Sequence, residues 1–145
     1  MGDYTLASPR IAVEDSYDAI YEHFYNEGVT DGLPIVPPTE ERVQRMVAAS
    51  GRRPDEVVAP EIPPRRAPAT VEKIAANAVM AGCAPEYMPV LIAATEAMAD
   101  LDLNLYGVTT STSPAALLLV INGPIRQKLD INCSQGLFGP GRRSN

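Results

Sequence analysis

The sequence has few of the residues that several common functional sites require. His23 is the only histidine, which is too few for a zinc site built from this chain alone and gives poor support for a Ser–His–Asp triad. Cys83 and Cys133 are the only cysteines, and in an acidic chain without a leader they are typical of thiols rather than of a disulfide framework. Basic residues are outnumbered, with a formal net charge of −6, which argues against non-specific binding of nucleic acid.

Long apolar runs are missing too, and proline is abundant. No stretch reaches the roughly 18 apolar residues that a membrane helix needs, and "MGDYTLASPR" lacks the layout of a signal peptide. We therefore expect a cytoplasmic protein.

The 14 prolines are about twice the average usage of roughly 5%. They gather in "LPIVPPT", "APEIPPRRAP" and "CAPEYMP", which predicts long extended connectors.

The remaining sequence predicts an N-terminal arm over residues 1–14 and a single α/β domain of mixed α+β type over residues 15–145. Apolar spacing, capping residues and glycine stops predict amphipathic helices in the N-terminal part. These helices cover about residues 17–27, 40–50, 71–81 and 85–100. The last one is apolar on most sides, so we expect it to be largely buried.

Beyond Asp100 the pattern changes from helix to strand. "LNLYGVTTSTSP" favours a strand that leads into a loop rich in hydroxyl groups, and "AALLLVING" favours a buried strand. We therefore expect a small buried sheet near the C-terminus. Val57 and Val58 are candidates for a short edge strand.

The two cysteines are the candidate catalytic residues. Cys83 stands between a glycine that ends one helix and a proline that begins another. Near a helix N-terminus the partial positive charge favours the reactive thiolate. Cys133 precedes a glycine-rich loop and is expected to be accessible. The alternative for both is inert packing, because free cysteine is among the most buried residue types.

The tail "INCSQGLFGPGRRSN" is the first candidate substrate-binding segment. Glycines allow successive backbone N–H groups to form an anion-binding nest, and arginines add charge. The residues concerned are Gly136, Gly139, Arg142 and Arg143. The spacing matches neither the P-loop nor the dinucleotide fingerprint, and the alternative is a flexible turn.

A second candidate segment follows the predicted strand. Thr109, Thr110 and Ser111 offer hydroxyls of the kind that orient substrates at strand ends. The alternative is helix capping by Ser113 ahead of Pro114. Asp31 is left open between a site residue and part of a turn.

Three blocks together resemble an uncharacterised bacterial family associated with UGSC proteins, which carry a selenocysteine/cysteine-Gly-Ser-Cys motif. The blocks are "DGLPIVPPTEERV" (Asp31–Val43), "MAGCAPEYMPVLIAATEAM" (Met80–Met98) and "NCSQGLFGPGRRSN" (Asn132–Asn145). The blocks come in order, and the resemblance covers most of the chain from about Asp15 onward. The UGSC motif itself is absent, so the resemblance implies that another chain supplies that thiol or selenol. It also implies that this chain is an N-terminal portion, encoded separately or released by cleavage after Asn145.

These observations lead to a functional expectation. The chain is expected to be a subunit, or a processed N-terminal fragment, of a hetero-oligomeric bacterial enzyme that uses thiol-dependent chemistry of the reductase or lyase type on a small anionic molecule. One alternative is a non-catalytic structural subunit that supports a catalytic partner chain. Another is a metal-dependent component, in which Cys133 and Cys83 or Asp31 complete a site with partner ligands. No cofactor is identified by the sequence.

Overall fold

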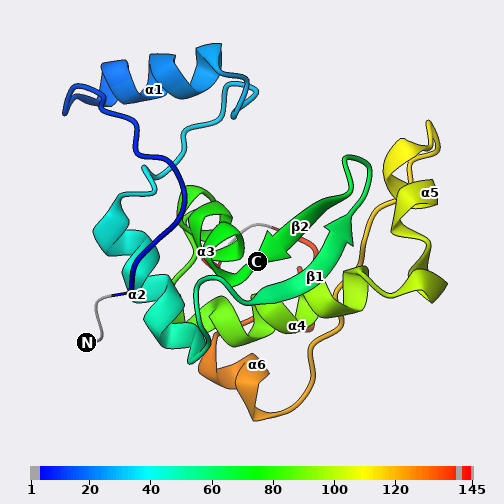
Figure 1. The fold of residues 1–145 in the computed structure, drawn as a ribbon. Helices are drawn as coiled ribbons and strands as arrows, with labels where there is room; N and C mark the ends of the chain where they lie inside the picture. The colour runs from blue at the N-terminus through cyan, green and yellow to red at the C-terminus, as the bar shows by residue number, and fades with distance from the viewer. Residues whose placement is uncertain (1–3, 140–141, 145) are drawn as a thin grey trace.

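The computed structural model of the chain describes residues 4–139 and 142–144. Six α-helices, two 3₁₀ turns and one two-stranded antiparallel sheet make up this part (Figure 1), in agreement with the expected mixed α+β class. The elements are α1 (Tyr17–Asn26), α2 (Glu40–Ser50), β1 (Val57–Ile62), β2 (Ala67–Thr70), α3 (Val71–Met80), η1 (Pro85–Tyr87), α4 (Met88–Met98), η2 (Leu101–Leu103), α5 (Leu105–Thr110) and α6 (Pro124–Lys128). None of the described helices is long and apolar enough to cross a membrane.

The main core lies where α2, α3 and α4 meet. The helix α2 contributes Val43, Met46 and Val47, the stripe that the apolar spacing predicts. Small residues on the facing side of α3 allow the two helices to approach closely. The other core residues of these helices are Val71, Ala75, Ala78, Val79, Met88 and Ile92.

The N-terminal segment is packed against this core. Leu6 is buried in the core cluster. The backbone N–H groups of Ala7 and Ser8 donate to the two carboxylate oxygens of Glu72 at 2.9 and 2.8 Å. Glu72 itself is buried in the first turn of α3, where the helix dipole also favours a negative charge. Residues 4–8 are therefore held along α2 and α3.

The position of the sheet differs from the prediction. The sheet consists of β1 and β2, paired antiparallel in the middle of the chain, with Val57 opposite Thr70. The predicted strand after Asp100 is instead helical, as η2 and α5. Residues 115–120 have no regular secondary structure and are exposed, and no described strand pairs with them. A continuous apolar run becomes a buried strand only where neighbouring strands supply hydrogen bonds and cover, and the described part of the chain supplies neither.

The burial of α4 is also less than predicted. Only Met88, Ile92 and Thr95 are buried on it, because α2, α3 and β1 together cover only part of its surface. Ala93 and Ala97 are exposed, so alanine makes this helix look more apolar in sequence than its packing requires.

Helix α3 offers a test of local capping. The Thr70 hydroxyl accepts a hydrogen bond from the Lys73 N–H at 3.3 Å, whereas Thr39 at the same position of α2 makes no such side-chain bond. We expect Thr70→Ala to lower the free energy of unfolding by about 1 kcal/mol and Thr39→Ala by only a few tenths. Urea unfolding of both variants measures the difference. Equal losses would show that the Thr70 hydroxyl does not stabilise the helix.

Candidate functional site

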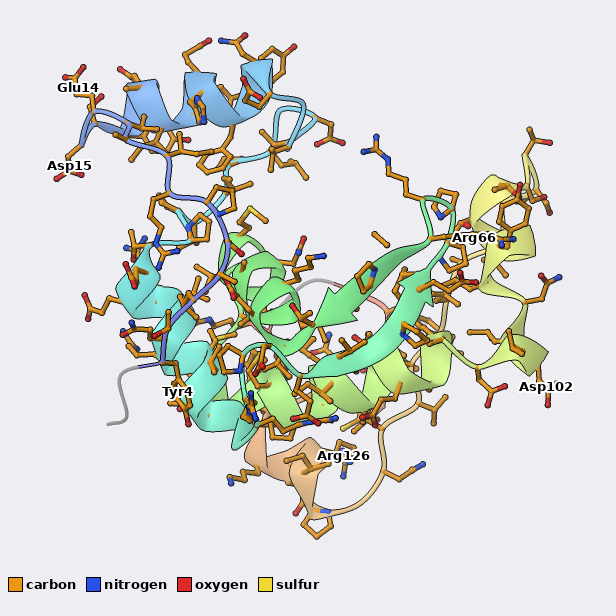
Figure 2. All side chains as sticks on the ribbon, in the orientation of Figure 1. Tyr4, Glu14, Asp15, Arg66, Asp102 and Arg126 are labelled. Carbon is orange, nitrogen blue, oxygen red and sulfur yellow. The ribbon has the colours of Figure 1, made fainter. Side chains whose placement is uncertain are left out.

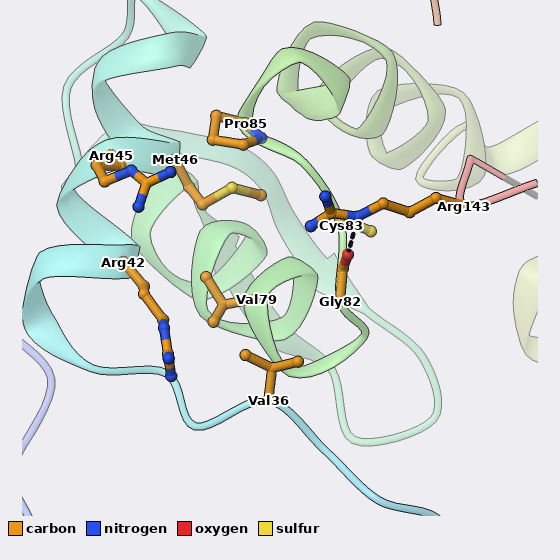
Figure 3. Close-up of a pocket in the computed structure, with 9 residues that line it drawn as sticks. All are labelled: Val36, Arg42, Arg45, Met46, Val79, Gly82, Cys83, Pro85 and Arg143. Atoms are coloured by element: carbon orange, nitrogen blue, oxygen red, sulfur yellow. Dashed lines mark hydrogen bonds between the residues drawn. The ribbon is translucent and has the colours of Figure 1, made fainter. Parts of the chain in front are cut away.

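A cavity of about 170 Å³ lies between α2, the end of α3 and the C-terminal tail (Figure 3). Its walls are largely aliphatic, and a thiol and three guanidinium groups border it. The lining residues are Val36, Arg42, Arg45, Met46, Val79, Gly82, Cys83, Pro85 and Arg143.

The end of α3 positions the thiol. Gly82 has a φ of +78°, a conformation that glycine adopts without strain. Its N–H donates to the carbonyl of Val79 at 2.9 Å, and the Cys83 N–H donates to the carbonyl of Ala78 at 2.9 Å. This pair of bonds is the Schellman pattern of a helix C-terminus, and it places Cys83 at the edge of the cavity. The glycine stop that the sequence predicts therefore also sets the position of the sulfur.

The C-terminal tail comes back to the same place. The Arg143 Nε donates to the Gly82 carbonyl at 2.8 Å, across 61 residues of sequence, and Figure 3 shows this side chain reaching Gly82 and Cys83 from the tail. Cys83 and Arg143, two of the predicted site residues, are thus brought together.

The expected lowering of the Cys83 pKa is wrong. Burial raises the pKa of this thiol, and the positive charge of Arg143 opposes that rise without cancelling it. The predicted helix start at Pro85 is a 3₁₀ turn of three residues before α4 begins, so the sulfur is not at the first turn of a long helix. Desolvation, which the sequence does not reveal, decides the direction.

Two arginines of the cavity were missed by the sequence reasoning. Arg42 and Arg45 lie one turn apart on α2 and project toward the cavity in Figure 3. The Glu41–Arg45 spacing favours an ordinary surface ion pair at i,i+4, so the sequence gives no reason to place Arg45 in a binding site. In the structure Arg42 donates to the Pro37 carbonyl at 2.8 Å, and Arg45 makes no ion pair or hydrogen bond with a described residue. No carboxylate borders this cavity among the described residues, so the charged groups of its described lining are all positive.

Apart from Arg143, the described residues of the glycine-rich tail do not line the cavity. Cys133 is exposed, and Arg142 is ion-paired with Asp130. Gly136 adopts a φ of +76°, and the Gly139 N–H donates to its carbonyl at 2.8 Å, so this N–H serves the turn itself. The part of the predicted anion-binding loop at positions 140 and 141 lies outside the described residues.

The hydroxyl-rich segment does not line this cavity either. Thr109 and Thr110 donate to carbonyl groups one turn earlier in α5, at 3.0 and 2.8 Å. The Ser111 hydroxyl accepts from the Ser113 N–H at 3.0 Å. Asp31 is exposed in a bend. These hydroxyls are therefore used within their own segment.

Two further findings bear on function. No group of three or more His, Cys, Asp or Glu side chains in residues 4–139 and 142–144 is placed to hold a metal ion. A comparison of the chain with protein-family models, with curated proteins and with solved structures finds no match. The resemblance to the UGSC-associated family stays a prediction, and the cavity is the feature of this chain that bears most directly on function.

Proposed function

We propose that the chain is a subunit of a hetero-oligomeric enzyme that binds a small anionic molecule beside the Cys83 thiol. The observation that supports this most is the composition of the cavity: one thiol, three arginines and no carboxylate among its described lining residues. Guanidinium groups bind carboxylate and phosphate through paired N–H donors. A molecule held in this way presents its neighbouring carbon or sulfur atom to the Cys83 Sγ.

Thiol chemistry at this cavity needs a proton acceptor from elsewhere. The raised pKa keeps Cys83 protonated at neutral pH, and the thiolate is the nucleophile. No histidine borders the cavity, since His23 lies on α1. We therefore assign the proton acceptor to the substrate or to a partner chain. This assignment supports the proposal that the site is incomplete in the isolated subunit. In a lyase-type reaction the thiolate adds to the substrate and is expelled again after the substrate has lost its leaving group. In a reductase-type reaction the substrate accepts two electrons and two protons, while Cys83 and a second thiol from a partner chain form a disulfide.

Competing alkylation reactions test the anion-binding part of the proposal. Iodoacetate and iodoacetamide both transfer a two-carbon group to a thiolate with loss of iodide, but only iodoacetate is an anion. We expect the rate ratio of iodoacetate to iodoacetamide to be about tenfold higher at Cys83 than at Cys133, since opposite charges a few ångströms apart at a protein surface interact by roughly 1–4 kcal/mol. Peptide mass spectrometry after timed quenching measures both cysteines in the same molecule.

A matched pair of arginine variants supplies the control. Arg45→Gln removes a cavity charge that has no described partner, and Arg126→Gln removes an arginine of α6 that does not line the cavity. We expect the rate ratio of iodoacetate to iodoacetamide at Cys83 to fall at least about threefold in Arg45→Gln and to stay unchanged in Arg126→Gln. An equal preference for iodoacetate at the two cysteines would contradict the proposed anion site. The alternative would then be a non-catalytic structural subunit, which the exposed apolar residues Leu118 and Val120 favour.

A further inference from the structure

The negative charge of this chain is concentrated in one short segment. The 18 acidic residues outnumber the 12 basic ones by six. Residues 14–31 hold six acidic residues and no Lys or Arg, so the remaining chain is balanced, with 12 of each. Helix α1 lies in this segment, and Figure 2 shows Glu14 and Asp15 pointing away from the protein just before it. No ion pair involves any of these six carboxylates within the described residues.

The same helix carries an aromatic stripe that is partly exposed, most of all at Tyr17 and Tyr25. Tyr17, Tyr21 and Tyr25 stack on successive turns, with ring centroids 6.1 and 6.2 Å apart. Ile20 and Phe24 continue the stripe on the same side by helical spacing. None of the residues of α1 is buried, and the helix lies apart from α2, α3 and α4 in Figure 1.

The complementary surface lies on the same chain. Four arginines of the described part are neutralised by ion pairs: Arg10, Arg52, Arg53 and Arg142. The three cavity arginines, Arg42, Arg45 and Arg143, have no carboxylate partner among the described residues, and they surround an aliphatic hollow. This hollow is complementary to the aromatic stripe of α1. Its aliphatic wall suits the aromatic rings, and its arginines suit the carboxylates of Asp18 and Glu22 beside them.

We propose that α1 of one copy docks on the arginine-bordered cavity of a second copy, and that the second copy docks in return. The connections on both sides of α1 are fixed to the main core. Before α1, the Ser8 N–H donates to Glu72 and the Arg10 side chain donates to Glu40. After α1, the Val36 N–H donates to the carbonyl of Met80. Each copy therefore presents one acidic helix and one basic cavity, and a closed two-fold dimer forms the contact between them twice. The carboxylates of α1 then occupy the position that we assign to a small anion, so dimerisation regulates access to the proposed site. This inference rests on the proposed function only for that last step.

Charge reversal with mixing tests this dimer. Sedimentation velocity of the purified chain between about 1 and 200 µM is expected to show a monomer–dimer equilibrium. Asp18→Arg with Glu22→Arg reverses the helix, and Arg42→Glu with Arg45→Glu reverses the cavity. Each double variant alone is expected to dimerise at least about tenfold more weakly, because like charges then face each other at both interfaces.

The equimolar mixture of the two double variants is the decisive sample. In the mixed dimer, arginines of one helix face glutamates of one cavity, and the natural acidic helix faces the natural basic cavity. We expect the dimer affinity to return to within about threefold of the wild-type value. Circular dichroism of each variant confirms that it is folded.

Three outcomes would overturn the proposal. The first is a wild-type chain that stays monomeric at every concentration, and the second is a dimer that neither reversal weakens. The third is an equimolar mixture that stays monomeric, which is the result expected if α1 closes on the cavity of its own copy or docks on a different protein. The reversed helix leaves the cavity residues intact, so its iodoacetate preference at Cys83 reports on the proposed function separately from the dimer.

Discussion

Met88→Ala is expected to lower the free energy of unfolding by about 2–5 kcal/mol, the range found when a large buried aliphatic side chain is truncated. Met88 is the first residue of α4 and is 0% exposed. It belongs to the same core cluster as Met46 of α2 and Val79 of α3, so its truncation leaves a void where the three helices meet. For a domain stabilised by roughly 5–15 kcal/mol, this is a large part of the total.

An exposed leucine supplies the control for this effect. Leu101 lies just beyond α4 and is 91% exposed, and we expect Leu101→Ala to change the free energy of unfolding by less than about 0.5 kcal/mol. Urea unfolding followed by circular dichroism measures both variants. A loss at Met88 no larger than the one at Leu101 would mean that α4 does not pack on the core as described.

Glu72→Gln is expected to lower the free energy of unfolding by about 1–3 kcal/mol at neutral pH, because the amide has one acceptor oxygen for two backbone donors. The N–H group of Ala7 or Ser8 then faces an amide N–H instead of a carboxylate oxygen. The N-terminal segment then keeps only one of its two hydrogen bonds to α3, which weakens the attachment that holds Leu6 in the core. Glu41→Gln on the exposed surface of α2 is the matched control, with an expected change below about 0.5 kcal/mol.

The pH dependence of this effect follows from the carboxylate. Burial tends to raise the pKa of Glu72, but hydrogen bonds from Ser8 and Ala7 and the charge of Arg10 outweigh it and hold the pKa below its ordinary value. A lowered pKa stabilises the fold above the unfolded value of about 4.3 and loses that contribution as the pH falls through the folded value. We therefore expect the stability gap between wild type and Glu72→Gln to be complete at about pH 6–7 and to narrow below about pH 4. A gap that is the same at about pH 7 and pH 3.5 would contradict the role of the charge.

Part of the candidate site was predictable, and the missing part has a definite cause. The glycine stop of α3 and the thiol after it are local features, so Cys83 could be selected from its neighbours in sequence. Arg143 could be selected as a cation, but its hydrogen bond to Gly82 joins residues 61 positions apart. Arg42 and Arg45 follow an acidic helix start that favours surface ion pairs, and only the return of the tail to α2 and α3 makes them part of a cavity.

The sequence by itself determined helices α1 to α4, because capping hydroxyls, glycine stops and apolar spacing act within a few residues of each other. It did not determine η2 and α5, where the pattern favoured a strand. Ser16 and Gly51 mark helix ends where the pattern predicts them. Only the tertiary structure decided the position of the sheet, the exposure of residues 115–120 and the direction of the Cys83 pKa. Strand pairing, burial and desolvation depend on which distant segments come into contact, and the same apolar run or thiol behaves differently with and without that cover.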